Sequence, residues 1–351
     1  MRVLVNALPL RYGGGVTYLM EQMAAFARVV PDWDLHHLVA PWAEIDGLPG
    51  TTEVVPGRNV AALFAYEQLL LPLRPTDVLY CPANFGPFVS KAPMVLTVHN
   101  AHYYRSGLEM PETSALRPPW KVKANHWAMR CAHTIVAISH AQAHQVEVTL
   151  PGIAHKLRVI HSGVPGWPAT SNPVRSLPDR YVLTVANTAA HKRVGDVVAG
   201  WAGALDLTGA PVALVLVGRV TSDQITRYRA AAGRHERRLV FNGPVSDRGQ
   251  LKWMYENATV MVSMSALESF PLTPSEAGSV GCPIVLSDIP THREVSLGHA
   301  TFVQVGDTTD LALTLADGFT SWEWGRERWE WPVTWDDNAR ALFDILEAAA
   351  G

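Results

Sequence analysis

The chain of 351 residues is poor in cysteine and has neither a long apolar run nor an excess of one charge. Its 3 cysteines form no C-x-x-C pair and its 14 histidines form no H-E-x-x-H pattern, so no zinc-site motif is present. The longest apolar run, Ala210 to Val217, is far shorter than the roughly 18 residues that span a bilayer. We therefore expect no transmembrane segment. We expect all three thiols to be buried and reduced: Cys81, Cys131 and Cys282.

Charge and composition narrow the class of protein further. Lys and Arg number 29 against 32 Asp and Glu, so the chain has no overall positive field for a nucleic-acid backbone, and we expect no nucleic-acid partner. Hydrophobic residues make up 48% and charged residues 17%, which is typical of a folded globular protein. At about 150 residues per domain, the length predicts two domains.

The N-terminus lacks the pattern of an export signal. Asn6, Pro9 and Arg11 interrupt the apolar stretch before it forms the hydrophobic region of a signal peptide. We therefore expect a cytoplasmic protein.

Short apolar runs alternate with helical patterns along the chain. Residues 2–8 are predicted to form a buried strand, Gly13 to Gly15 a loop, and residues 16–28 a helix with apolar residues at helical spacing. The same alternation continues and restarts after a Gly- and Pro-rich stretch at residues 163–178. It predicts an α/β fold with two Rossmann-like parallel sheets. The expected divisions are a first domain at 1–165, a linker at 166–178, a second domain at 179–330, and a segment at 331–351 ending in an amphipathic helix.

In an open parallel sheet, ligands bind at the carboxyl ends of the strands, and the glycine loop lies at such an end. Gly13 to Gly15 do not have the G-x-G-x-x-G spacing, and no acidic residue ends the second strand, so the fingerprint of NAD binding is absent. No G-K-[ST] occurs, which excludes a P-loop. The glycines either contact a ligand or form a plain tight turn.

Two further sets of residues follow predicted strands. His99 comes directly after the strand at residues 94–98, and either hydrogen-bonds a substrate or is held by backbone. Lys192 and Arg193 follow the strand at residues 181–186, where they either are solvated or clamp a diphosphate. His102 and His161 carry a weaker signal. The D-x-D at residues 32–34 lies before a strand, at the edge where no ligand is expected.

The stretch from Glu268 to Glu276 is the most informative. Pro271 and Pro274 forbid a continuous helix, so Glu268 is predicted to lie on a loop. Thr273 as N-cap, Pro274 at the first helical position and Glu276 form a predicted capping box, whose role is structural. The same turn offers free N–H groups to an anion, beside a carboxylate that accepts from hydroxyls. Sugar nucleotides carry both chemical features.

In order and spacing, these motifs resemble those of the retaining glycosyltransferases of family 4, which have the GT-B fold. The resemblance covers most of the second half and is thinner in the first. The motifs that carry it are Gly13–Gly15, Val98–Asn100, Ile138–Ser139, Val159–Val164, His191–Arg193, Val215–Gly218, Phe241–Asp247 and the pair Glu268 and Glu276.

The resemblance implies that a nucleoside diphosphate sugar binds mainly to the second domain and an acceptor mainly to the first. Glu268 would then hold hydroxyls of the donor sugar, Glu276 the ribose, and Lys192 the diphosphate. The backbone near Val245 would meet the base, and His99 would lie by the transferring sugar. The glycine loop would close over the phosphates, and the last helix would return to the first domain.

Three positions depart from the family pattern. Asn187 stands where many relatives have an arginine, so the positive charge at the diphosphate must come from Lys192 with Arg193 and a helix N-terminus. Pro271 replaces a common glycine and removes one N–H donor, and Asn100 replaces a frequent aspartate. The donors that remain near Pro271 are Phe270, Leu272 and Thr273.

The expected activity is a hexosyltransferase-type transfer, with retention, to an acceptor hydroxyl or amine, without metal or other cofactor. A nucleotide-sugar epimerase of similar fold and a non-catalytic sugar-nucleotide binder are the alternatives. The segment at residues 103–125 either shapes the acceptor site, touches a membrane surface or is a solvated loop. The sequence leaves open the base, the sugar, the acceptor and the oligomeric state.

Overall fold

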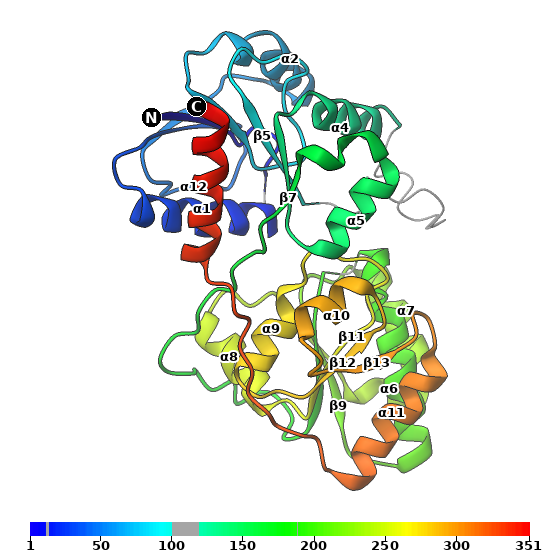
Figure 1. Cartoon of the computed structure of the whole chain (residues 1–351). Coiled ribbons are helices and arrows are strands. Elements are labelled where there is room, and N and C mark those ends of the chain that lie inside the picture. The colour runs from blue at the N-terminus through cyan, green and yellow to red at the C-terminus, as the bar shows by residue number, and fades with distance from the viewer. Residues whose placement is uncertain (12–13, 100–118, 188) are drawn as a thin grey trace. The chain divides into compact units, whose positions relative to one another are not determined.

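The computed structural model describes residues 1–11, 14–99, 119–187 and 189–351. The expectations for Gly13, Asn100 and His102, and for most of the segment at residues 103–125, lie outside the described residues. The chain divides into two compact units (Figure 1). The first comprises Met1–Pro165 with Pro332–Gly351, and the second comprises Gly166–Trp331.

The first unit contains a seven-stranded sheet in which all neighbouring strands are parallel. Its spatial order is β3-β2-β1-β4-β5-β6-β7. The central strands are buried on both faces, as apolar runs without alternation require. The strands are β1 Arg2–Asn6, β2 Asp34–Val39, β3 Thr51–Val54, β4 Val78–Cys81, β5 Met94–Val98, β6 Thr134–Ala137 and β7 Leu157–Val159.

The helices of the first unit connect these strands, and the last helix of the chain joins them. α12 packs on α1, where the Gln22 Nε2 atom donates to Asn338 Oδ1 at 2.7 Å. The Asn338 Nδ2 atom donates in turn to the carbonyl of His161 at 2.7 Å. The elements are α1 Gly14–Val29, α2 Val60–Leu69, η1 Leu71–Leu73, α4 Pro119–Cys131, α5 His140–Thr149, η3 Pro151–Lys156 and α12 Trp335–Ala350.

The second unit contains a six-stranded parallel sheet in the order β10-β9-β8-β11-β12-β13. Its strands are β8 Tyr181–Val185, β9 Ala213–Val217, β10 Leu239–Gly243, β11 Val260–Ser263, β12 Ile284–Ser287 and β13 Thr301–Val303. Its helices are η4 Ala190–Lys192, α6 Val194–Thr208, α7 Ser222–Ala232, η5 Gly233–Arg238, α8 Arg248–Asn257, α9 Leu272–Ser279, α10 Pro290–Ser296 and α11 Thr308–Ser321.

The structure confirms the predicted fold class of two Rossmann-like parallel sheets. Sequence patterns missed the edge strands β3, β7 and β13 because all three are short and partly exposed, so burial imposes no clear period on them. The prediction for the thiols is wrong for Cys131, which is exposed at the end of α4, whereas the other two cysteines are buried.

No helix within the described parts of the chain is both long enough and apolar enough to cross a bilayer.

Each sheet reverses its strand order at one point, and this reversal creates a position for ligands. In the first unit the chain continues from β1 and from β4 toward opposite edges of the sheet, and in the second unit it does so from β8 and from β11. The loops that follow the two strands diverge there, and ligands of open α/β sheets bind outside the carboxyl ends of such strands.

Candidate functional site

Lys192 and Glu268 meet at the switch point of the second sheet. Lys192 ends the 3-10 turn after β8, and Glu268 lies on the loop between β11 and α9. The backbone N–H of Ala266 donates to the carbonyl of His191 at 2.8 Å, which fastens the two loops to each other. The Lys192 Nζ atom then lies 2.6 Å from Glu268 Oε1.

The environment of Glu268 keeps its carboxyl group ionised. Its side chain is only 10% exposed, and that of Lys192 is 23% exposed. Burial acts to raise the pKa of Glu268, but Lys192, His292 and a hydrogen bond from Ser265 together lower it below its ordinary value. An anionic acceptor and a cation are thus held side by side in a largely desolvated place, where charge interactions are strong.

Arg193 and Asn187 of the loop after β8 are placed differently from Lys192. Arg193 adopts a left-handed backbone conformation at the N-cap of α6, with φ +47°, and its guanidinium pairs with Asp196 of the same helix. Asn187 is exposed, and its Oδ1 atom accepts from the N–H of Ala189 at 3.2 Å. Of the two cations in this loop, Lys192 is therefore the one that contacts Glu268.

The start of α9 differs from the prediction. The helix begins at Leu272 with Pro271 as its N-cap, and no side chain caps it, so the predicted capping box of Thr273 and Glu276 is wrong. Pro271 has a fixed φ of −76°, which suits an N-cap, and this starts the helix two residues earlier than expected. Pro271 and Pro274 have no N–H. The free donors of the first turn are consequently those of Leu272 and Thr273.

Glu276 turns away from the helix start and enters a polar cluster. Its side chain is 7% exposed, and its Oε1 atom accepts from Arg248 Nη1 at 2.6 Å. The hydroxyl of Tyr255 donates to Oε2 at 3.2 Å, and the Arg248 guanidinium stacks 4.1 Å over the ring of Trp167. An ionised carboxylate has about four acceptor positions, so Glu276 can still accept from ligand hydroxyls.

His292 belongs to the same site, and sequence reasoning missed it. It lies on α10 after β12 and is fully buried. Its Nδ1 atom is 2.8 Å from the carbonyl of Ser287, while Nε2 has no hydrogen-bond partner. Since a carbonyl only accepts, Nδ1 carries the proton and Nε2 presents a lone pair. Burial lowers the pKa of His292, although the charge of Glu268 acts to raise it. Its position one turn after a strand was the signal available in the sequence.

A glycine is required beside this site at the end of β9. Gly218 has φ +139°, and a Cβ atom there would lie 2.0 Å from the carbonyl oxygen of Ala186. The close approach of this backbone to the end of β8 therefore excludes any side chain.

In the first unit, the glycine segment forms the N-terminus of a helix. Gly14 and Gly15 are the first residues of α1, and neither has a positive φ. A Cβ atom on Gly15 would lie 2.8 Å from Leu10 Cδ2, so the missing side chain permits close packing after β1. The first backbone N–H groups of α1 lie at the carboxyl edge of the sheet.

His99 follows β5 at the same edge. Its backbone N–H donates to Asn84 Oδ1 at 2.7 Å. Burial lowers the pKa of its ring to about 4, although a hydrogen bond to the carbonyl of Pro82 acts to raise this pKa. The buried Nε2 atom has no partner, so Nδ1 donates to Pro82 and Nε2 presents a lone pair. The neutral ring can therefore accept from a hydroxyl group, whereas donation from Nε2 would need a protonated ring or the other tautomer.

Tyr18 packs against His99 and connects it to the C-terminal helix. The two rings meet edge to face with centroids 4.3 Å apart. Gln22 Nε2 donates to the Tyr18 hydroxyl at 2.8 Å and also to Asn338 of α12. Burial raises the pKa of Tyr18 to about 12, so it stays a neutral phenol. The last helix thereby supports the ring that orients His99.

The remaining predicted residues are placed as follows. Val245 is half-buried after β10 and packs on the apolar core of its unit. Asp34 opens β2 at the amino edge of the first sheet, where it pairs with Arg2 at 3.0 Å, so the D-x-D lies at the edge opposite His99. His161 contributes a backbone carbonyl to Asn338 and packs its ring 5.0 Å from that of His140.

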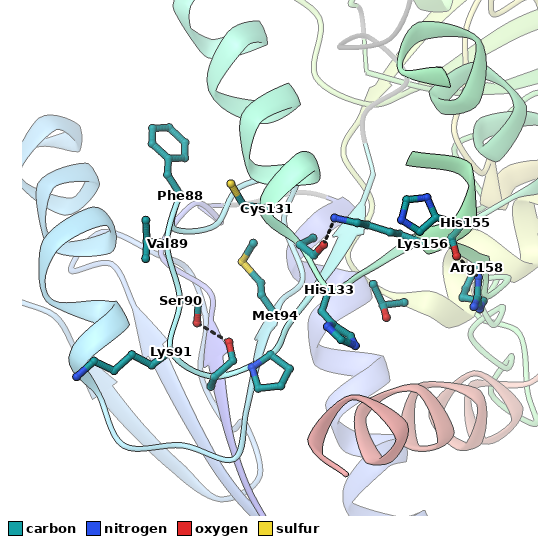
Figure 2. A pocket seen from close by; sticks show the side chains of 14 residues that line it. Phe88, Val89, Ser90, Lys91, Met94, Cys131, His133, His155, Lys156 and Arg158 are labelled. Carbon is teal, nitrogen blue, oxygen red and sulfur yellow. Dashed lines mark hydrogen bonds between the residues drawn. The ribbon is translucent and has the colours of Figure 1, made fainter. Parts of the chain in front are cut away.

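The amino edge of the first sheet carries a hollow of about 820 Å³ (Figure 2). Residues that precede β5, β6 and β7 line it, together with the last residue of α4, Cys131. It is separate from the carboxyl edge on which His99 lies. No acidic residue lines it.

Comparisons with known proteins show what the second unit and the whole fold are similar to. Residues 171–323 match the family model of the glycosyl transferases group 1. No curated protein sequence matches the chain. Among solved structures, HepE (Alr3699) of Anabaena in complex with UDP and glucose is 17% identical with a TM-score of 0.69, over 99% of this chain and 95% of that one. The lipopolysaccharide outer core galactosyltransferase WaaB is 18% identical with a TM-score of 0.66, over 99% and 100%. The lipopolysaccharide glycosyltransferase WaaG is 13% identical with a TM-score of 0.67, over 100% and 98%.

The two sheets and their order define the chain as a protein of the GT-B glycosyltransferase fold. The residues that match the family model of the glycosyl transferases group 1, 171–323, include Lys192, Glu268, Glu276 and His292.

Proposed function

We propose that this protein is a retaining glycosyltransferase that moves a sugar from a nucleoside diphosphate sugar to an acceptor hydroxyl or amine without a metal ion. The observation that carries the proposal is the ion pair of Lys192 with Glu268 at the β8–β11 switch point. The two free N–H groups at the start of α9 follow Glu268 on the same loop. This combination serves an anionic diphosphate and a hydroxylated sugar together.

Each group of the donor has a partner in the second unit. Lys192 and the N–H groups of Leu272 and Thr273 face the diphosphate in this proposal, with charge-assisted hydrogen bonds. Glu268 uses Oε1 for Lys192, and its carboxylate retains acceptor positions for sugar hydroxyls. The lone pair of His292 Nε2 adds a second hydroxyl acceptor beside Glu268.

Glu276 is assigned to the ribose of the nucleotide and the backbone near Val245 to the base. Arg248 and Tyr255 fix both carboxylate oxygens of Glu276, so the group is oriented before the nucleotide arrives. Preorganised acceptors of this kind cost little rotational entropy on binding.

The reaction requires stabilisation of the charge that develops on the leaving group. As the bond between the anomeric carbon and the diphosphate oxygen breaks, negative charge grows on that oxygen, and Lys192 with the α9 N–H groups stabilises it. The acceptor oxygen forms the new bond on the same face, and its proton passes to the leaving diphosphate. Glu268 remains an ionised, ion-paired acceptor and takes no proton.

Lys192 supplies the positive charge that other transferases obtain from a divalent cation. The D-x-D motif does not compete for this role because Asp34 lies at the amino edge and pairs with Arg2. Full turnover in the presence of a chelator is therefore expected.

The acceptor is assigned to the first unit. The neutral His99 ring accepts a hydrogen bond from a hydroxyl of the acceptor, and the N-terminus of α1 lies at the same sheet edge. HepE was solved with UDP-glucose, so UDP-sugars are the first donors to test.

The decisive experiment is thermal stabilisation by a panel of UDP-, GDP- and dTDP-sugars, followed by NMR of the product's anomeric configuration. A ligand at a hundred times its dissociation constant stabilises by about 2.7 kcal/mol, which a melting curve resolves. Asp34→Asn, at the opposite sheet edge, is the control that should leave binding unchanged. Inversion at the anomeric carbon would overturn the retaining assignment. Release of an altered nucleotide sugar without acceptor would indicate an epimerase, and binding without turnover a non-catalytic protein.

A further inference from the structure

The first part of the predicted linker, residues 166–172, is docked on α8. The second unit begins here, so we call these residues the entry segment. The Lys252 Nζ atom of α8 donates to the carbonyl of Pro168 at 3.0 Å. Further along, Asn172 Nδ2 donates to Oδ2 of Asp247, the N-cap of α8, at 2.9 Å. The entry segment is therefore held against α8, although its composition is that of a linker.

Trp167 is the aromatic residue of the entry segment, and it contacts both helices that carry the polar cluster of Glu276. Its Nε1 atom donates to Ser279 Oγ at 2.8 Å, one turn after Glu276 on α9. Its ring meets that of Tyr255 edge to face with centroids 5.8 Å apart, and the Arg248 guanidinium lies 4.1 Å over its face. The two side chains that bind the carboxylate of Glu276 are thus both packed on one indole ring.

Arg248 needs such a support more than Tyr255 does. Tyr255 is fully buried, whereas the side chain of Arg248 is long and 35% exposed. Fixing a long side chain at the surface costs conformational entropy, which a flat stacking partner offsets. Stacking on Trp167 uses the face of the guanidinium and leaves its N–H groups, which lie in the plane, directed at Glu276. Glu276 is itself only 7% exposed, so it cannot follow an arginine that moves into water.

We propose that Trp167 is a positioning residue for the nucleotide: it holds Arg248, and through Arg248 it keeps the carboxylate of Glu276 oriented toward the ribose hydroxyls. This inference rests on the proposed function, in which Glu276 binds the ribose. A tryptophan that only covered the apolar core beneath it would contribute to stability and leave nucleotide affinity unchanged. The two roles of Trp167 therefore differ in a measurable property.

The test is calorimetric titration of the full chain with UDP, GDP and dTDP, followed by donor kinetics. Trp167→Leu should raise the Kd of the tightest of these nucleotides about five-fold, the effect of losing a cation–aromatic stack at a partly exposed position. The KM for the donor should rise by a similar factor with kcat almost unchanged, because the diphosphate separates the ribose from the bond that breaks. Trp167→Phe keeps a ring under the guanidinium and should bind within about two-fold of the wild type.

A double-mutant cycle tests whether the effect passes through Arg248. Arg248→Lys keeps a positive charge beside Glu276 but lacks the planar group that stacks, so it should weaken nucleotide binding by itself. Adding Trp167→Leu should then raise the Kd by about two-fold at most, because the stack is already lost. Arg248→Lys also carries the test if Trp167→Leu does not fold, and wild-type affinity in Arg248→Lys would contradict the proposal.

Isotope labelling of arginine alone gives a readout that needs no nucleotide. The side chain of Arg248 lies over the face of the indole ring, so the ring current should shift its proton resonances upfield. Arg248→Lys assigns these resonances. The shift should disappear in Trp167→Leu and persist in part in Trp167→Phe, which has a smaller ring.

Trp322 supplies a matched control in the same unit. The Arg180 guanidinium lies over its ring at the same distance of 4.1 Å, and Trp322 is 41% exposed. Arg180 directly precedes β8, so this stack lies at the amino edge of the second sheet. Trp322→Leu removes an equivalent stack that does not contact the cluster of Glu276, and it should leave nucleotide affinity and KM unchanged. Melting curves establish that each variant is folded.

Several results would overturn this role of Trp167. They are wild-type affinity in Trp167→Leu, equally poor binding by Trp167→Phe and Trp167→Leu, independent effects in the cycle, or an equal loss of affinity in Trp322→Leu. A wild type that binds none of the three nucleotides overturns the proposed function and this role with it. A wild type that binds them while Trp167→Leu binds equally well overturns this role alone.

Discussion

Replacing Lys192 with methionine separates the role of the ion pair in stability from its role in transfer. The methionine keeps most of the apolar stem but leaves Glu268, whose side chain is 10% exposed, without its cation. A hydrogen bond to a charged group contributes about 1.5–3 kcal/mol, and a buried charge left unpaired costs somewhat more. Because Lys192 is 23% exposed, we expect a loss near the lower end, about 2 kcal/mol in the free energy of unfolding.

Lys192→Met should affect the rate of sugar transfer more than it affects stability, and a second substitution that removes the charge of Glu268 should restore stability but not transfer. Loss of one preorganised group that stabilises the leaving diphosphate costs about 3 kcal/mol in the transition state, roughly a hundred-fold in kcat. In Lys192→Met with Glu268→Gln, both charges are gone, so urea unfolding should show most of the stability regained. Turnover should remain at least as low as in the single variant.

The pH dependence of stability gives an independent check on the pair. The pKa of Glu268 is lowered in the folded chain, so the pair stabilises above the unfolded value of about 4.3 and this contribution disappears as pH falls through the lower folded value. Lys192→Met should lose this acid-side decline. Near wild-type turnover in the single variant, or a double variant as unstable as the single one, would refute the reasoning.

Four other outcomes follow from the site and its surroundings. Glu276→Gln should weaken nucleotide binding about ten-fold in calorimetry, because a neutral amide is a poorer acceptor for ribose hydroxyls. His292→Phe should raise the KM for the donor more than it lowers kcat. With a donor that lacks the hydroxyl bound by His292, the variant and the wild type should have the same KM, so a series of single-deoxy donors identifies that hydroxyl. If no deoxy donor removes the difference between the two proteins, the assignment is wrong. Gly218→Ala should cost about 2–4 kcal/mol in urea unfolding, because the new Cβ atom meets the carbonyl of Ala186 at 2.0 Å in a backbone region with φ +139°. A maleimide should label Cys131 alone in the native protein and the two buried thiols only after unfolding, as counted by mass spectrometry.

The loop position of Glu268 was predictable because it depends on local chemistry. Pro271 and Pro274 prevent a helix through the segment that holds Glu268, whatever the rest of the chain does. The start of α9 was misplaced because Pro271 serves as N-cap, and a fixed φ near −76° is compatible with that position as well as with a loop. Local rules allowed both starts, and packing selected one of them.

The meeting of residues far apart in the chain was beyond local rules. Lys192 and Glu268 are 76 residues apart, and Arg248 and Glu276 are 28 apart. The contact of Lys192 with Glu268 arises because β8 and β11 are neighbours in the sheet, which brings the loops after their carboxyl ends together. His292 escaped notice for the same reason, because a histidine on a short helix has no distinguishing pattern until its neighbours are known.

The sequence by itself determined the alternation of buried strands with helices, and hence two parallel sheets with reactive residues after the strands. Hydrophobic periodicity and the chemistry of Pro and Gly act over a few residues, so they can be recognised directly. Only the tertiary structure decided which cation pairs with which carboxylate, that α12 packs on α1, and that two tryptophans of α4 stay exposed. Those outcomes depend on strand order and on the packing of distant segments, for which local sequence carries no fixed spacing.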